Sequence, residues 1–438
     1  MLSIPAWPVA AESLSSPFHL SASGELPDWS RLDPYQRTIS RADFVHEWTS
    51  NYYGGQSPAN ASPLITILDD RVRIVKQFKR PAEIYELFFA PSSGPPPPGR
   101  IWRGVQDLPP AASLDKPLDG LRIAIDPGHI GGEWARMEQR WFLIPERPVP
   151  GDPKSDAVIT RPPPNPATAP RSERVPVKEG EIVLRVAELL EQKLTKQGAR
   201  VALVRRLFEP VTRKRPQDFL EEARLAGGFP VGTDPETNRA LASAAERMFY
   251  LSDEIRARAT KINRLFKPDF AICLHVNAEP WGDPENPDFV AANHFHMLIN
   301  GTYSDAEIAF DDQRFELLHR LVERMHPEEE ALSATVAGVV ATVTGLPAYL
   351  YPGSNARRTP VSEYVWSRNL LATRVYECPV VFLEPYVMNN QVTHDRVQAG
   401  EYHGNREILG NSYVNLYEEY ADSVATGVVT YFRNHRRQ

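Results

Sequence analysis

The sequence predicts an α/β protein with an open, mostly parallel sheet flanked by helices, with large insertions and a small N-terminal accessory segment. From residue 121 onward, short apolar segments rich in β-branched residues alternate with longer segments whose apolar residues recur every three or four positions. This alternation is typical of layered α/β domains. Polar side chains also follow three of the short apolar segments directly, and open α/β sheets bind ligands at that edge.

Length and composition narrow the class of protein further. A chain of 438 residues fits two or three domains, or one domain with large insertions. Its 42% hydrophobic and 24% charged residues are typical of a globular protein. The net charge of −7 argues against a nucleic-acid partner. No run of about 18 apolar residues predicts a transmembrane segment, and the two cysteines exclude a disulfide framework.

The 41 prolines, well above the average usage of about 5%, mark the expected domain boundaries. We expect residues 1–24 to be disordered or processed, although they lack the basic region of a secretory signal. Residues 91–118 are expected to be a proline-rich linker, since four consecutive prolines occupy 95–98. The linker separates an accessory domain over 25–90 from a main domain over 119–438, with insertions near 133–176, 207–243 and 281–345.

Within the accessory domain, the apolar segments 64–68 and 72–75 predict a hairpin, and residues 82–89 predict a short helix. The proline-rich stretches 145–176 and 207–240 are expected to be mostly irregular. In the main domain, the pattern predicts strands over 121–125, 199–204, 270–274, 293–299 and 380–383, and helices over 180–197, 244–265, 313–325, 331–342 and 413–432.

Two histidines follow predicted strands of the main domain. His129 follows the strand 121–125 through the turn residues Pro127 and Gly128, and His275 follows the strand 270–274 directly. Neutral imidazole is the commonest metal ligand in proteins. A lone histidine at a turn is more often a surface residue, but two histidines at strand ends of one sheet favour a metal site.

Three carboxylates join these histidines as candidates. Glu179 and Glu181 begin the helix 180–197, where the helix dipole favours carboxylates without any further role. A His, Glu, His set with an open position for water is, however, a known catalytic zinc arrangement. Glu384 follows four apolar residues, and burial there would raise its pKa into the range of a general acid or base.

At this point the residues 121–434 resemble the zinc-dependent N-acetylmuramoyl-L-alanine amidases of bacterial cell-wall turnover. The opening signature of that family is similar to IAIDPGHIGG at 123–132, and its third-ligand strand is similar to PDFAICLHVNA at 268–278. The segment 368–384 resembles the one that ends in the catalytic glutamate. Further similar positions are Arg205, Arg258, Asn263 and Asn390.

The resemblance implies a site and an activity. It assigns His129, Glu179 and His275 as Zn²⁺ ligands, with Glu181 as the alternative ligand, and Glu384 as the catalytic acid and base. Glu133 and Glu138 remain more remote alternatives as ligands. The implied reaction is hydrolysis of the amide between N-acetylmuramic acid and L-Ala in the stem peptide of peptidoglycan or a muropeptide. Asn277, Arg258 and Arg374 are candidates for binding this substrate, and Arg256 is a further candidate for its carboxylates.

Other interpretations stay open at this level. The same residues suit another zinc peptidase or carboxypeptidase on a similar sheet, or a wall-binding or regulatory protein without catalysis. The implied substrate places the protein in the periplasm or outside the cell, and a protein activator is an open possibility. A last hypothesis is that the segment 305–344 or the segment 207–240 covers the zinc site as a lid.

Overall fold

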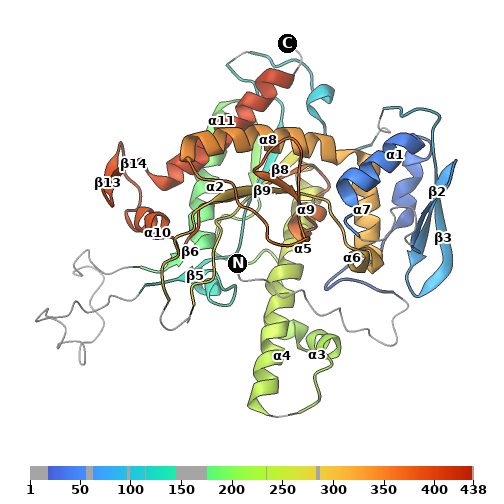
Figure 1. Ribbon diagram of the computed structural model, residues 1–438, viewed down its shortest axis with the longest axis horizontal. Coiled ribbons are helices and arrows are strands. Elements are labelled where there is room, and N and C mark those ends of the chain that lie inside the picture. The colour runs from blue at the N-terminus through green and yellow to red at the C-terminus, as the bar shows by residue number, and fades with distance from the viewer. Residues whose placement is uncertain are drawn as a thin grey trace, which may run out of the picture.

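The computed structural model of the chain describes residues 18–55, 63–95, 99–113, 115–144, 175–232, 234–282 and 287–436. The predictions for residues 1–17, for the prolines at 96–98 and for the loop over 145–174 lie outside these ranges. The described residues form a seven-stranded sheet covered by helices, with a smaller three-stranded sheet to one side (Figure 1).

The seven-stranded sheet is open and mostly parallel, as predicted. Only the pairs β12 with β9 and β10 with β11 are antiparallel among its described neighbours. The strand order across the sheet is β10 (Arg357–Arg358), β11 (Val365–Ser367), β9 (Phe295–Ile299), β12 (Val380–Pro385), β8 (Phe270–Leu274), β4 (Arg122–Pro127) and β7 (Arg200–Leu203).

Helices cover both faces of the sheet, which explains why β8 and β9 are buried at every position. On one face, alternate side chains of the strands pack against α2 (Glu179–Lys196), α8 (Met325–Thr344) and α11 (Leu416–His435). On the other face, the remaining side chains pack against α5 (Glu254–Leu265) and the region of α9 (Leu371–Arg374). The continuous apolar runs in the sequence are therefore strands with two buried faces.

The structure confirms most predicted elements of the main domain to within a few residues, but two predictions need correction. The helix predicted over 244–265 is α4 (Pro235–Met248), a π-helical turn and then α5. The segment 207–240, predicted to be mostly irregular, contains α3 (Leu220–Gly227) and the start of α4. Two of its breaker residues lie at helix boundaries: Pro235 opens α4 beside the capping Asp234, and Gly228 ends α3 with a positive φ.

The N-terminal region contains a confirmed hairpin and a prediction that was wrong. The hairpin is β1 (Ile65–Ile67) paired with β2 (Arg71–Gln77). The predicted helix 82–89 is instead the strand β3 (Arg80–Phe88). Ile84 faces Val75 and Leu87 faces Val72 across the pair, so cross-strand packing outweighs the helical preference of the local sequence.

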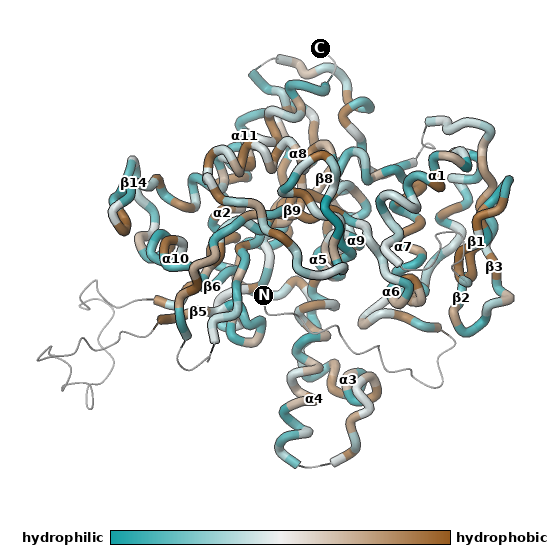
Figure 2. Tube along the Cα trace, in the orientation of Figure 1, coloured by the Kyte–Doolittle hydropathy of each residue, from teal (hydrophilic) through white to brown (hydrophobic). Residues whose placement is uncertain are grey.

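This region shares its core with a helix of the main domain. Side chains near α1 (Arg41–Glu47), such as Phe44 and Trp48, and those of β1–β3 pack against α7 (Asp311–Glu323). In Figure 2 the strands β1–β3 carry a mixture of hydrophobic and hydrophilic colours, in keeping with a small sheet that has one buried face. The apolar side chains of α1 and β1–β3 are thus buried against α7 of the main domain. The boundaries of an accessory domain over 25–90 stay a prediction.

The segment 305–344 supplies part of the main core. It contains α6 (Asp305–Ala309), α7 and α8, and Leu332, Val336 and Val340 of α8 are buried beside the sheet. These contacts make α8 a layer of the fold, which does not fit the hypothesis of a lid.

The remaining elements are α10 (Gln391–Gln398), the pair β5 (Trp141–Phe142) and β6 (Val177–Lys178), and the pair β13 (Arg406–Ile408) and β14 (Asn411–Tyr413).

None of the helices within the described ranges combines the length and apolar character needed to cross a bilayer.

A buried histidine makes stability depend on pH. His326, in the first turn of α8, lies beside the ring of Tyr52, and burial lowers its pKa to about 3, with the charges of Arg357 and Arg320 adding to the effect. The unfolded chain has a histidine pKa near 6.5. This contribution to stability is therefore complete above about pH 6.5 and is lost as the pH falls toward 3.

When the pH is lowered from 7 to 4.5, we expect the free energy of unfolding to fall by about 2 kcal/mol less in His326→Gln than in the parent. Urea unfolding at both pH values measures this difference. His403→Gln is the control, because His403 is exposed and should leave the loss unchanged. Equal losses for the parent and for His326→Gln would contradict the assignment.

Candidate metal centre

His129 stands on a tight turn that follows β4. Its backbone has a φ of +52°, a conformation that L-residues rarely adopt and that the surroundings must hold. Arg258 stabilises this backbone conformation, because its guanidinium donates to Pro127 O at 3.0 Å and to His129 O at 2.9 Å. Arg205 donates to Pro127 O and Gly128 O as well. The two arginines anchor the turn that presents His129.

His275 follows β8 and meets this turn at very close range. A Cβ atom on Gly128 would lie 2.2 Å from Cε1 of His275, so only glycine fits between the two histidines. The backbone amide of His275 donates to Leu383 O, and its ring stacks on Phe382 with centroids 4.5 Å apart. The imidazole of His275 is thereby held from the side of β12.

Glu179 is the first residue of α2 and is 1% exposed. Its Oε1 atom accepts from Val276 N at 3.0 Å and lies 3.0 Å from Nδ1 of His275. Its Oε2 atom lies 3.4 Å from Nε2 of His129. The structure thus brings the three predicted ligands together from β4, α2 and β8.

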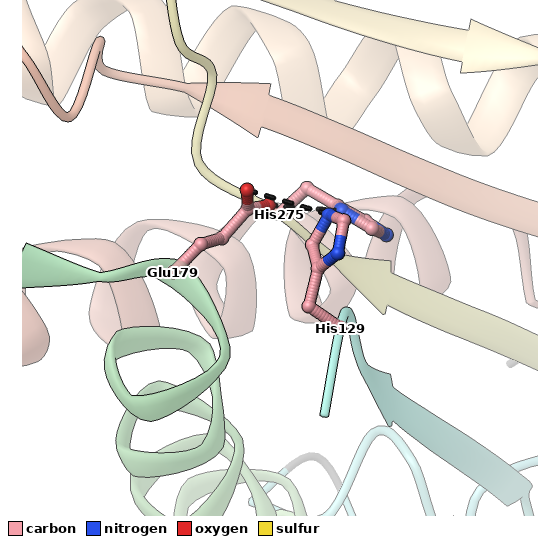
Figure 3. A group of neighbouring side chains, drawn as sticks. All are labelled: His129, Glu179 and His275. Atoms are coloured by element: carbon pink, nitrogen blue, oxygen red, sulfur yellow. Dashed lines mark hydrogen bonds and ion pairs between the residues drawn. The ribbon is translucent and has the colours of Figure 1, made fainter. Parts of the chain in front are cut away.

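The three side chains converge on one point, as Figure 3 shows. One ligand atom from each of them falls within 4.8 Å of the other two, so the group could hold a metal ion. Oε2 of Glu179 is buried and makes no hydrogen bond of normal geometry, which leaves a lone pair for a cation. Two imidazoles and one carboxylate are a ligand set that suits zinc and leaves a further position open.

Two further residues lie near the group: Glu138, which the sequence suggests only as a remote alternative ligand, and Arg140, which the sequence does not suggest. Glu138 accepts from Ile130 N and Gly131 N, and its Oε1 atom lies 3.5 Å from Nδ1 of His129. A carboxylate behind a ligating histidine orients the ring and raises its basicity. Arg140 places Nε 3.0 Å from Oε2 of Glu179. Both lie in the insertion that follows His129, where no periodic pattern or motif marks them.

Electrostatics separates the two carboxyl groups of the site, of which Glu179 is buried and Glu384 is partly buried. Burial alone would raise the pKa of Glu179, but His129, His275 and Arg140 outweigh it and bring the pKa to about 2. Burial raises the pKa of Glu384 to about 7, and the negative charge of Glu179 adds to the increase while His275 opposes it. Glu179 therefore stays ionised as a ligand would, and Glu384 can exchange a proton near neutral pH.

Glu384 lies at the edge of the same group. Leu383 of β12 pairs with Leu274 of β8, so the next residues, Glu384 and His275, lie at the same level of the sheet. On its other side, Glu384 faces His296 of β9. A buried strand thus delivers the carboxyl beside the histidine, as the sequence predicts.

The other predicted residues lie outside the group. Glu181, the alternative ligand, forms an ion pair with Lys178 at 2.7 Å, and Glu133 is exposed. Asn277 is partly buried and its Oδ1 atom accepts from Ala278 N. The predicted substrate-binding arginines have protein partners in place of open positions. Arg258 pairs with Asp126 and Glu254, Arg374 pairs with Glu316, and Arg256 pairs with Asp312 and Glu316.

Comparisons with known proteins give matches among solved structures alone. No protein-family model and no curated protein matches the chain. Ami1 from Mycobacterium abscessus, an N-acetylmuramyl-L-alanine amidase, is 15% identical with a TM-score of 0.33, covering 72% of this chain and 99% of its own. The amidase AmiC2 of Nostoc punctiforme is 12% identical with a TM-score of 0.32, covering 72% and 98%.

A third similar structure is the CwlD amidase from Clostridioides difficile in complex with the GerS lipoprotein. It is 12% identical with a TM-score of 0.35, and the match covers 71% of this chain and 98% of that one. At such low identities and TM-scores, the function has to be inferred from the site residues themselves.

The position of Glu138 generates a test of the metal centre. We expect Glu138→Gln to lower zinc affinity about 10-fold to 100-fold, because a carboxamide is a weaker partner for the ring of His129. Competition with a chromogenic chelator measures the affinity without any need for activity. Glu133→Gln, in the same insertion but exposed, is the matched control and should bind as the parent does. Unchanged affinity in Glu138→Gln would remove Glu138 from the site.

Proposed function

We propose that the protein is a zinc-dependent hydrolase that cleaves the amide between N-acetylmuramic acid and L-Ala of the peptidoglycan stem peptide. The observation that carries the proposal is the meeting of His129, Glu179 and His275 beside Glu384, whose pKa is about 7. A ligand set for a metal and an adjacent proton carrier are the two parts that hydrolysis of an amide requires. The substrate follows from the resemblance of the motifs around these residues.

The residues fit Zn²⁺ as the cofactor. His129 and His275 would supply nitrogen ligands, and Glu179 would supply an oxygen through the buried Oε2 atom that lacks a hydrogen bond. When bound in such a site, zinc polarises a carbonyl and lowers the pKa of water to about 7. Glu138 would keep the ring of His129 in the orientation that ligation needs.

Glu384 would move the proton during the reaction. A carboxyl with a pKa of about 7 is ionised in a large fraction of molecules at neutral pH, so it can accept a proton from the attacking water. The protonated carboxyl then donates to the leaving amine, since an amine is a poor leaving group until it is protonated. His275 follows β8 and Glu384 lies on the neighbouring strand β12, so the proposed proton carrier stands beside a proposed metal ligand.

The proposed substrate also bears on location and partners. Peptidoglycan lies outside the cytoplasm, so we infer that the protein acts in the periplasm or outside the cell. The arm formed by α3 and α4 packs its apolar residues against Ile130 and Trp134, directly after His129. We infer that a protein activator bound to this arm would act on the turn that carries His129.

The direct test is mass spectrometry of the products formed from purified muropeptides, with and without a chelator. We expect free stem peptides that begin at L-Ala and intact sugar chains, both lost when the metal is removed. Shortened stem peptides that remain attached to sugar would instead indicate the alternative, a zinc peptidase. Absence of products from the zinc-loaded protein would favour a binding or regulatory role.

A substitution at Glu384 separates proton transfer from metal binding. We expect Glu384→Gln to lower kcat about 100-fold to 10,000-fold, because the carboxamide cannot carry the proton. Zinc content should remain that of the parent, since Glu384 is not among the three converging ligands. The matched control is Glu363→Gln at an exposed position. A variant that keeps its rate would exclude Glu384 as the acid and base.

A further inference from the structure

Arg140 approaches the metal group from the insertion that follows His129. Its Nε atom lies 3.0 Å from Oε2 of Glu179, and within the described residues it is the arginine that pairs with a proposed ligand. Its backbone is fixed on both sides, because Arg140 N donates to Ala135 O at 2.8 Å and Arg140 O accepts from Glu179 N at 3.2 Å. The residue is therefore held beside the first turn of α2 wherever its side chain points.

The side chain of Arg140 lies on the open side of the group. It is 26% exposed, whereas the side chains of His129 and His275 are 12% and 15% exposed and that of Glu179 is 1% exposed. Its charge also acts on the proposed proton carrier. Burial raises the pKa of Glu384 to about 7, and the positive charges of His275 and Arg140 oppose this increase. The guanidinium thus stands near both carboxyl groups, on the side from which a substrate enters.

Arg140 is not needed to neutralise Glu179 once zinc is bound. Oε1 of Glu179 accepts from Val276 N and lies 3.0 Å from Nδ1 of His275, and Oε2 is the buried oxygen that is left for the metal. A cation at Oε2 repels the guanidinium from that oxygen, because like charges a few ångströms apart are unfavourable. The backbone contacts keep the residue at the site, so a positive charge without its carboxylate remains beside the reacting groups.

We propose that Arg140 is a further catalytic residue, whose guanidinium stabilises the negative charge that develops on the scissile carbonyl oxygen. This inference rests on the proposed function and adds a residue to the same site. Nη1 of Arg140 donates to Gln139 O at 3.1 Å, and no hydrogen bond within the described part of the chain occupies Nη2. A guanidinium is always protonated, so it can donate to the oxygen without moving a proton. Donors that stand ready where charge develops are among the largest contributions to catalysis.

The movement of electrons in the reaction defines what Arg140 does. The oxygen of the attacking water bonds to the carbonyl carbon while one of its protons passes to Glu384, and the π pair of the C=O bond moves to the carbonyl oxygen. That oxygen then carries one negative charge, which Arg140 stabilises. When the C=O bond forms again, the C–N bond breaks and the proton on Glu384 passes to the leaving nitrogen. The products are a carboxyl group and an amine, and Arg140 keeps its proton throughout.

Removal of the guanidinium tests this role. At equal zinc content, we expect Arg140→Met to lower kcat on an N-acetylmuramoyl dipeptide about 100-fold to 1,000-fold, as loss of one such donor does. KM should change little, because the interaction is made with the developing charge and not with the bound substrate. In competition with a chromogenic chelator, the variant should bind zinc at least as tightly as the parent, since a positive charge beside Glu179 has been removed.

Two inhibitors that differ in one group separate a catalytic role from a structural one. In the first, a tetrahedral phosphinate with a negative oxygen replaces the scissile amide, and in the second an uncharged ketomethylene replaces it. We expect calorimetry to show that Arg140→Met loses about as much affinity for the phosphinate as it loses in kcat, with little change for the ketomethylene. A variant whose site is only distorted would lose affinity for both.

Arg136→Met is the matched control. Arg136 lies in the same insertion, is exposed, and places its guanidinium 4.5 Å from the ring centroid of Trp141. This variant should keep the parent's kcat and both affinities. If Arg140→Met does not fold, a crystal structure of the zinc-loaded parent with the phosphinate decides. A nitrogen of Arg140 about 2.7–2.9 Å from a phosphinate oxygen would support the role, and a guanidinium elsewhere would refute it.

The outcomes separate this inference from the proposed function. If the parent cleaves the dipeptide substrate and Arg140→Met is as fast, Arg140 only neutralises Glu179, and the inference is wrong while the amidase activity stands. Equal losses of affinity for the two inhibitors would also overturn it. If the zinc-loaded parent cleaves no muropeptide, the proposed function fails, and the role of Arg140 fails with it.

Discussion

The buried negative charge of Glu179 is the constraint on which the rest of the site depends. A carboxylate that is 1% exposed is strongly unfavourable unless it is paired and hydrogen-bonded. Val276 N, the two histidines and Arg140 provide this compensation, and they come from three different parts of the chain. The start of α2 is thereby tied to the carboxyl ends of β4 and β8. The same arrangement that stabilises the charge concentrates ligands for a cation.

Close backbone approach and a second buried network maintain this geometry. A Cβ atom on Gly180 would lie 2.5 Å from Gly131 N, so α2 can approach the turn after His129 only with glycine there. Behind the turn, Arg258 joins Asp126 to Glu254 by ion pairs, and Tyr376 donates to Asp126 at 2.7 Å. Arg258, which the sequence suggests as a substrate ligand, thus positions the turn that presents His129.

Patterns along the chain were sufficient for the strands and for the residues that follow them. Phe270–Leu274 and residues 380–383 are continuous apolar runs, so the placement of His275 and Glu384 directly after them follows from burial on both faces. The choice between Glu179 and Glu181 was not accessible, because both begin the same helix and only packing against β8 distinguishes them. The partners of Arg374 and Arg258 are distant in sequence, at Glu316 and Asp126. Local propensity also failed at β3, where pairing with β2 decides the conformation.

The central claim is that one zinc ion binds between His129, Glu179 and His275. The most direct measurement is an anomalous difference map from crystals of the zinc-loaded protein, recorded on both sides of the zinc absorption edge. The account predicts one strong peak about 2.0–2.2 Å from a nitrogen of each histidine and from an oxygen of Glu179. Arg140, whose Nε atom lies 3.0 Å from that oxygen, should then have moved away from it. A peak at other residues, or no peak between these three, would contradict the account.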